Sequence, residues 1–214
     1  MASIFLNGGP FMYVILGVSI IAMAIFLERA AFLYFRMNMN IDKAYKQVLF
    51  PLEKKNFRAA LEACSKMRRH PLGSILKAGL IKADRKDKEI ERAMEERILS
   101  ESSRLKSRVN LLTLFANIST LLGLLGTILG LITAFQSVSS ADEAIKQEIL
   151  AKGISMAMLT TAAGLVVAIP CLAGYYILNN RGDYLIDKLE EKAISLSNML
   201  SSMKQKKVAD GTIQ

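Results

Sequence analysis

Two long stretches of this chain contain no Asp, Glu, Lys, Arg or His, and they limit its fold more than any other feature. They run over residues 109–135 and 153–180. A helix needs about 20 predominantly apolar residues to cross the hydrocarbon core of a bilayer. The backbone in that core must form its hydrogen bonds internally, and uninterrupted runs of this length predict helices. The sequence therefore predicts two membrane-spanning helices.

A third apolar stretch lies near the N-terminus. Residues 11–27 are apolar, and after Glu28 and Arg29 the apolar character resumes as AAFLYF, so we predict a helix over 11–35. Residues 1–10 contain no Lys or Arg. A cleaved secretory signal would carry a basic segment there, so we expect this helix to be retained. The predicted fold class is an all-α membrane protein with three transmembrane helices.

The basic residues predict the orientation. Of the 28 Lys and Arg residues, 19 lie in residues 36–108, six from 181 onward, two in 136–152 and none in 1–10. Cytoplasmic loops carry the excess of basic residues. We therefore expect an outer N-terminus (1–10), a cytoplasmic helical domain (36–108), an outer loop (136–152) and a cytoplasmic helical tail (181–214). The net charge of +9 then reflects topology and contact with the lipid bilayer, and we expect no nucleic-acid partner because acidic residues interleave the loop.

The cytoplasmic segments have helical periodicity. Apolar residues recur at spacings of three and four in IDKAYKQVLF, NFRAALEACSKM and PLGSILKAGLIKA, which Pro51 and the His70-Pro71 turn separate. The next piece, DKEIERAMEERILSESSRLKSRV, has no breaker before residue 109, so we predict that it continues into the membrane as one long helix. After the third span a heptad seam follows, which predicts either a helix lying on its own domain or an oligomeric bundle; it consists of Ile186, Leu189, Ala193, Leu196, Leu200 and Met203.

Both long spans carry a stripe of small residues that includes threonine. In hydrocarbon, helices associate through close packing of small residues and through polar contacts. One stripe consists of Thr120, Gly123, Thr127, Gly130 and Ala134, with Gly126 and Gly130 adding a GxxxG motif. The other consists of Ala157, Thr161, Gly164, Ala168 and Cys171. These stripes predict helix packing, and they also suit a polar pathway through the membrane.

Two of the threonines are expected at the same depth. Thr127 lies eight residues before the end of its span, and Thr161 lies eight residues after the start of its own. At a rise of about 1.5 Å per residue, both lie roughly 12 Å from the outer ends of two antiparallel helices. Neither span offers a titratable carboxylate or amine that relays a proton, so an ion carrier must come from another subunit. Glu28 and Arg29 are expected to snorkel to the interface.

The chain resembles the MotA/TolQ/ExbB proton-channel family, and its three-span ExbB and TolQ branch in particular. The resemblance rests on RLKSRVNLLTLFANISTLLGLLGTILGLITAF and GISMAMLTTAAGLVVAIP, and on the order of spans and cytoplasmic segments. It implies a bacterial inner-membrane protein in which a pentamer surrounds a dimer of a single-span ExbD or TolR-like partner. The partner's membrane aspartate would carry the ion, and Thr127 and Thr161 would line the pore.

Two positions depart from the pattern of this branch. Relatives usually have a glutamate where this chain has Met156, and a proline is common where it has Thr120. The first departure favours a specialised member that drives a different machine. Thr160 adds a hydroxyl beside Thr161 that would suit a sodium ion, although we favour protons.

The predicted function is an ion-channel-forming stator subunit that converts an ion gradient into movement of its partner. Thr127 and Thr161 are the predicted pore-lining residues, with Thr160 and Thr120 behind them. The alternative is a non-conducting membrane scaffold in which the stripes only pack helices. An enzyme is not expected, because the sequence offers no nucleophile with a base, no metal cluster and no phosphate loop, and we expect no cofactor.

Overall fold

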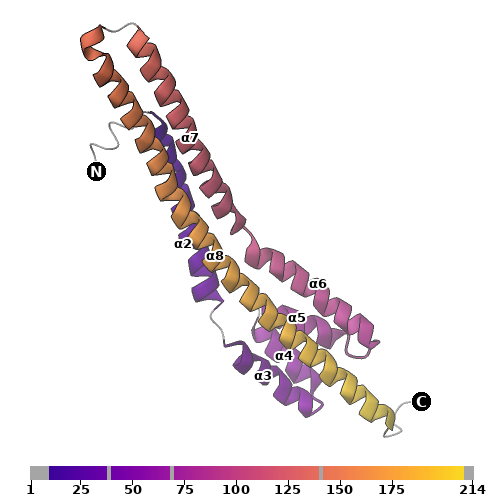
Figure 1. The fold of residues 1–214 in the computed structure, drawn as a ribbon. Coiled ribbons are helices and arrows are strands. Elements are labelled where there is room, and N and C mark those ends of the chain that lie inside the picture. Colours follow the sequence, from indigo (N-terminus) through magenta and orange to yellow (C-terminus); the bar gives the residue numbers. More distant parts are fainter. Residues whose placement is uncertain (1–9, 38–39, 68–69, 140–141, 210–214) are drawn as a thin grey trace. The chain divides into compact units, whose positions relative to one another are not determined.

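The computed structural model describes residues 10–37, 40–67, 70–139 and 142–209. Every regular element within these ranges is a helix (Figure 1). In chain order they are α2 (Pro10–Ala30), the π-helix η1 (Ala31–Arg36), α3 (Ile41–Glu53), α4 (Phe57–Lys66), α5 (Pro71–Ile81), α6 (Asp87–Lys106), α7 (Asn110–Ser139) and α8 (Glu143–Ala209). Three helical stretches are long and apolar enough to cross a membrane: Phe11–Arg36, Asp87–Ser139 and Glu143–Gln205. The predicted all-α fold with three such stretches is confirmed.

The chain divides into two compact units. The first consists of residues up to 30 together with 108–179, and it contains α2, α7 and the first part of α8. The second consists of residues 31–107 together with those from 180 onward, and it contains α3 to α6 and the remainder of α8.

In the first unit, α7 and α8 form an antiparallel pair. Gly123 lies against Gly164, Gly126 against Thr160 and Gly130 against Ala157, so the contact on α8 moves backward as the chain advances along α7. α2 packs against α7, and its Phe26 ring reaches Gly174 of α8 so closely that an added Cβ there would lie 2.8 Å from the ring.

The loop between the second and third spans is shorter than the sequence predicts. We expected an outer loop over 136–152, but α7 continues to Ser139 and α8 already begins at Glu143. Glu143 accepts a hydrogen bond from Lys146, 3.1 Å away, in the first turn of α8. A negative side chain at a helix N-terminus and an ion pair at this spacing both favour helix. α8 then runs without interruption through Pro170.

The second unit begins with short capped helices. The side chains of Asn40, Asn56 and His70 accept hydrogen bonds from backbone N–H groups at the starts of α3, α4 and α5. Each cap satisfies a donor that has no partner within its helix. Pro51, which we expected to end its helix, lies inside α3, which ends at Glu53. A proline near the C-terminus of a helix removes few hydrogen bonds, because little helix follows it.

The heptad seam of α8 is buried within its own unit. Leu189, Ala193, Leu196 and Leu200 are at most 3% exposed, and Ile186 is 9% exposed. Leu196 approaches Gly79 of α5, where an added Cβ would lie 3.6 Å from its side chain. The structure thus agrees with the first interpretation of the seam, a helix lying on its own domain.

The predicted single helix through residues 87–135 is interrupted. α6 ends at Lys106 and α7 begins at Asn110. Arg108, between them, has a φ of 63°, in the left-handed region. That conformation costs a non-glycine residue about 1–2 kcal/mol and does not continue a right-handed helix. The Arg108 guanidinium donates to Glu28 at 2.8 Å, and this tertiary contact accompanies the turn.

Candidate functional site

The contact between α7 and α8 is built on glycine. A Cβ added at Gly126 would lie 2.7 Å from Oγ1 and 2.8 Å from Cβ of Thr160, and one at Gly130 would lie 3.2 Å from Cβ of Ala157. Ala157 itself is 2% exposed. Only a hydrogen atom fits at Gly126, because van der Waals contact between carbon atoms begins at about 3.5 Å.

The closest backbone approach lies one turn farther along. A Cβ at Gly164 would lie 2.5 Å from the carbonyl oxygen of Ser119 and 3.2 Å from Cα of Gly123. Ala168, the next small residue of the α8 stripe, is 3% exposed. The site also includes Gly153, which the sequence analysis did not select and which faces Ala134. Small side chains and bare backbone therefore bring the two helices together over several turns.

The two threonines of α8 use their hydroxyls differently. Thr161 donates from Oγ1 across the interface to the carbonyl oxygen of Gly123, at 3.1 Å. Thr160 is 2% exposed and donates to Ala157 in its own helix, at 2.7 Å. Thr161 is therefore a polar link between α7 and α8, whereas Thr160 fills the space opposite Gly126.

The two threonines of α7 hydrogen-bond to their own helix. Thr127 donates to the carbonyl of Leu124 at 2.6 Å, and Thr120 donates to the carbonyl of Ala116 at 3.0 Å. Such bonds to carbonyls three and four residues back are common for threonine in helices. Neither hydroxyl contributes a link to α8.

Thr127 and Thr161 lie at nearly the same level. Because Gly123 faces Gly164 and Gly130 faces Ala157 in this antiparallel pair, Thr127 is level with Thr160 and is displaced from Thr161 by about one rise of 1.5 Å. With about 100° of rotation per residue, Thr127 points roughly 60° away from the mean direction of the α7 residues that face α8. Thr161 points roughly 60° away from the mean direction of the α8 residues that face α7. The two rotations have the same sense when each helix is viewed along its own chain direction. For antiparallel helices the same sense means the same side of the pair. The structure thus brings both predicted pore-lining residues to one level and one side.

A threonine hydroxyl that donates to a carbonyl keeps its lone pairs. Its oxygen then accepts a hydrogen bond from a neutral carboxylic acid, which carries an O–H. A carboxylate has no such donor, and the hydroxyl must rotate to donate to it instead. A hydroxyl at this position thus interacts with both protonation states of an acid.

A charged cluster lies at one end of the first unit. Glu28 accepts from Arg108 at 2.8 Å and lies 3.8 Å from a guanidinium nitrogen of Arg29. The Arg29 side chain, which we expected to snorkel to the interface, is only 8% exposed and lies against Glu28. No local pattern indicates Arg108 as the partner of Glu28, because 80 residues separate them.

Met156 is half-buried on α8. Because it is a methionine, the position at which we expected relatives to carry a glutamate supplies no carboxylate here. Among the residues that the structure describes, there is also no group of three or more His, Cys, Asp or Glu side chains placed to hold a metal ion.

Comparison with known proteins adds a family and a relative. Residues 67–191 match the model of the MotA/TolQ/ExbB proton channel family. Over 84 residues the chain is 47% identical to the biopolymer transport protein exbB1 of Vibrio cholerae serotype O1. That match covers 39% of this chain and 37% of the relative's length.

Proposed function

Because the chain belongs to the MotA/TolQ/ExbB proton channel family, we propose that it is an ion-conducting stator subunit that couples ion flow to movement of a partner. The matched segment contains α7 and the part of α8 that packs against it. The likeness to a protein named for biopolymer transport supports a role in transport at a membrane.

The proposed assembly is a pentamer around a dimer of a single-span ExbD or TolR-like subunit in a bacterial inner membrane. The N-terminus and the loop after α7 face the periplasm, and α3 to α6 lie in the cytoplasm. The distribution of Lys and Arg supports this orientation. The partner's membrane aspartate carries the ion, because neither long span provides a carboxylate.

One observation carries the proposal: the hydroxyls of Thr127 and Thr161 share a level and a side on a helix pair whose membrane segments contain no ionisable Asp, Glu, Lys, Arg or His. Their oxygens are the polar groups that the partner's acid meets there. As the acid loses or gains its proton, each hydroxyl changes from acceptor to donor by rotating away from its carbonyl. Hydrogen bonding to both forms lets the acid exchange its proton without an unpaired polar group in hydrocarbon. The buried position of Thr160 in the helix contact favours protons over sodium.

Thr161→Val tests the proposal because valine is nearly the same size and lacks the hydroxyl. We expect loss of proton flux in vesicles that contain the chain and its partner. The interhelical hydrogen bond to Gly123 is lost as well, but such bonds contribute only about 0.6 kcal/mol in membrane proteins, so the complex should still assemble. Flux is measured with an internal pH dye, and assembly by copurification.

Two matched variants complete the test. Thr161→Ser keeps the hydroxyl and should retain flux. Thr133→Val removes an α7 hydroxyl that bonds to its own helix and lies on a different side of α7 from Thr127. This variant should conduct normally. Normal flux in Thr161→Val, or equal loss in Thr133→Val, contradicts the assigned role.

A non-conducting scaffold is the second candidate. It is favoured by the observation that Thr120, Thr127, Thr160 and Thr161 all donate to protein carbonyls, which is what helix packing alone requires. In a scaffold, alanine at both Thr127 and Thr161 should leave the function of the complex intact, because small size is sufficient. In a channel, the same double variant should not conduct.

A further inference from the structure

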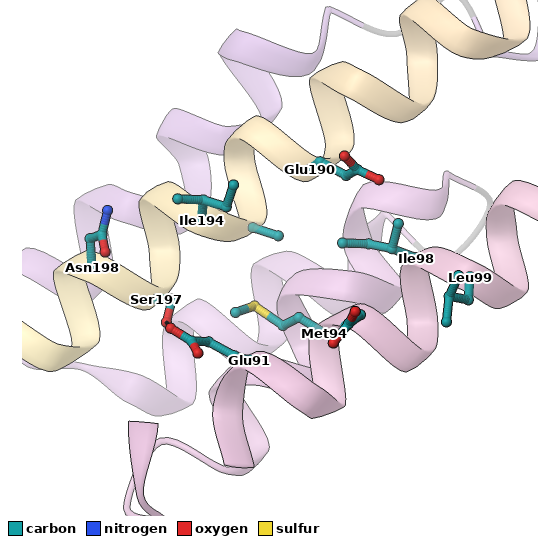
Figure 2. A pocket seen from close by; sticks show the side chains of 10 residues that line it. Glu91, Met94, Ile98, Leu99, Glu190, Ile194, Ser197 and Asn198 are labelled. Atoms are coloured by element: carbon teal, nitrogen blue, oxygen red, sulfur yellow. Dashed lines mark hydrogen bonds between the residues drawn. The ribbon is translucent and has the colours of Figure 1, made fainter. Parts of the chain in front are cut away.

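A groove with an acidic rim lies between α6 and α8 in the second unit. It has a volume of about 370 Å³ (Figure 2). Met94 and Ala193 form part of its apolar lining, and Leu99 and Ile194 at its border are 66% and 62% exposed. Exposed glutamates stand around it, and no Lys or Arg lines it; the glutamates are Glu91, Glu95 and Glu190. We call these residues the acidic groove.

The outer face of α3 has the opposite character. Lys43, Lys46 and Phe50 of α3 and its C-cap residue Lys54 are all exposed and recur at spacings of three and four, so they form one stripe. The Phe50 side chain is 62% exposed, and Lys54 Nζ lies 4.1 Å from its ring centroid. We call these residues the basic stripe. An aromatic ring among ammonium groups suits an apolar groove with a carboxylate rim.

The two surfaces lie at the same level along α8. Lys192 of α8 forms an ion pair with Asp42 of α3 at 2.6 Å, and its Nζ lies 5.7 Å from the ring of Tyr45. The groove-lining residues of α8 run from Glu190 to Asn198, on both sides of Lys192 in the sequence. The start of α3 therefore contacts the stretch of α8 that also lines the acidic groove.

They also lie on opposite sides of α8. At about 100° per residue, Lys192 points roughly 150° away from the mean direction of the groove-lining residues Glu190, Ala193, Ile194 and Ser197. A single chain therefore cannot bring its own stripe to its own groove. A neighbouring copy supplies the stripe instead, and its ammonium groups complement the carboxylate rim of the groove.

We propose that the basic stripe on α3 of one copy of this chain occupies the acidic groove between α6 and α8 of the neighbouring copy. The proposal rests on the homo-oligomer of the proposed function and adds the surfaces that hold its cytoplasmic part together. Because the two surfaces differ, the contact is head-to-tail, and repeated rotation closes it into a ring. Exposed ion pairs are individually weak. The contact therefore also relies on Phe50 against Leu99 and Ile194, and on the high effective concentration within one assembly.

Disulfide cross-linking between two tagged copies tests this contact. Phe50→Cys is made in one copy and Ile194→Cys in another, the two are co-expressed, and isolated membranes are oxidised with copper phenanthroline. We expect a disulfide-linked dimer that carries both tags. Neither variant expressed alone should give a dimer, because a head-to-tail contact does not bring a residue next to itself. The unmodified chain shows the contribution of Cys64 and Cys171, and Ile81→Cys with Ile194→Cys is the matched control, since Ile81 is also an exposed isoleucine, at 65%.

Charge reversal tests the electrostatic part. Lys46→Glu in the copy with Phe50→Cys should lower the cross-linked yield several-fold, as should Glu95→Lys in the copy with Ile194→Cys. The two reversals together should restore the yield, because they recreate an opposite-charge pair.

The results separate this inference from the proposed function. Native mass spectrometry counts the copies in the purified complex, and proton flux reports conduction. An oligomer without the Phe50–Ile194 cross-link overturns the interface and leaves the proposed function standing. Cross-linking of Ile194→Cys to itself, or equal yield with Ile81→Cys, also overturns it. A chain that is monomeric in its complex contradicts both.

Discussion

The single helix α8 packs in two different ways in the two units of the molecule. Between residues 143 and 179 its contacts with α7 use glycine, alanine and threonine, with backbone atoms at the interface. From residue 180 onward it buries leucines, and ion pairs border that contact, such as Lys204 with Asp87 at 2.8 Å and Lys192 with Asp42 at 2.6 Å. The change follows the solvent that we propose for each part.

The physical reason is that leucine gains nothing by moving from lipid to a helix interface. In hydrocarbon, close approach and a few polar contacts are what hold helices together. In water, each buried leucine contributes about 1.5–3 kcal/mol, and exposed ion pairs add little. The two units should therefore respond differently to the same kind of substitution.

The largest expected effect is in the second unit. Leu196 is fully buried in the seam, and Leu196→Ala should lower the free energy of unfolding by about 2–5 kcal/mol because it leaves a cavity. Thermal unfolding of the purified chain in detergent, followed by circular dichroism, measures this. Ile81→Ala, at an exposed position, should change stability by less than about 0.5 kcal/mol. Equal effects of the two substitutions would show that the seam is not a core.

A smaller effect is expected in the helix pair of the first unit, where adding a methyl group, instead of removing side-chain atoms, should destabilise the protein. Gly164→Ala adds one methyl group where the backbone of Ser119 leaves no room, and overpacking of this kind costs about 1–3 kcal/mol. Gly17→Ala is the matched control, since nothing lies within 4 Å of an added Cβ there. Alanine favours helix over glycine, so this variant should be neutral or more stable. If Gly164→Ala were as stable as Gly17→Ala, the close contact would be refuted.

The smallest effect concerns the cap of α5. His70 is 7% exposed, and its Nδ1 accepts from the backbone N–H of Leu72 at 3.2 Å. His70→Ala should cost about 1 kcal/mol through loss of the cap. Asn also accepts this hydrogen bond, so His70→Asn should retain most of the stability. Thermal unfolding of both variants at pH 7.5 provides the measurement.

The same residue predicts a pH dependence. Burial lowers the pKa of His70, and the nearby carboxylate of Glu101 opposes that shift only in part. The unfolded chain therefore binds more protons than the folded chain at pH values below about 6.5, so stability should fall as the pH drops through the folded pKa. His70→Asn removes the titrating group and should flatten this part of the stability curve between pH 7.5 and 5.5. An unchanged slope in that variant would assign the dependence to other residues.

Local patterns in the sequence were sufficient for most of the fold. The absence of charge over 109–135 and 153–180 predicted the long helices, and the periodicity of the short cytoplasmic segments predicted α3 to α6 within a few residues. The small-residue stripes indicated the faces that lie in the α7–α8 contact. These features depend on spacings of three and four residues, which a sequence shows directly.

Other features depend on contacts between distant residues. No glycine or proline marks the turn at Arg108, which accompanies an ion pair with Glu28. The burial of Arg29 and the contact of Gly153 with Ala134 also lack a local pattern.

The sequence by itself determined that this protein is a helical membrane protein, because hydrocarbon accepts only long, uncharged helices of this kind. It also determined the level of Thr127 and Thr161, since a constant rise per residue converts position in a span into depth. Only the tertiary structure decided which hydroxyl crosses between helices, where α6 separates from α7, and which side of α8 carries the acidic groove. These outcomes depend on how helices rotate and approach one another, and that is set by all their contacts together.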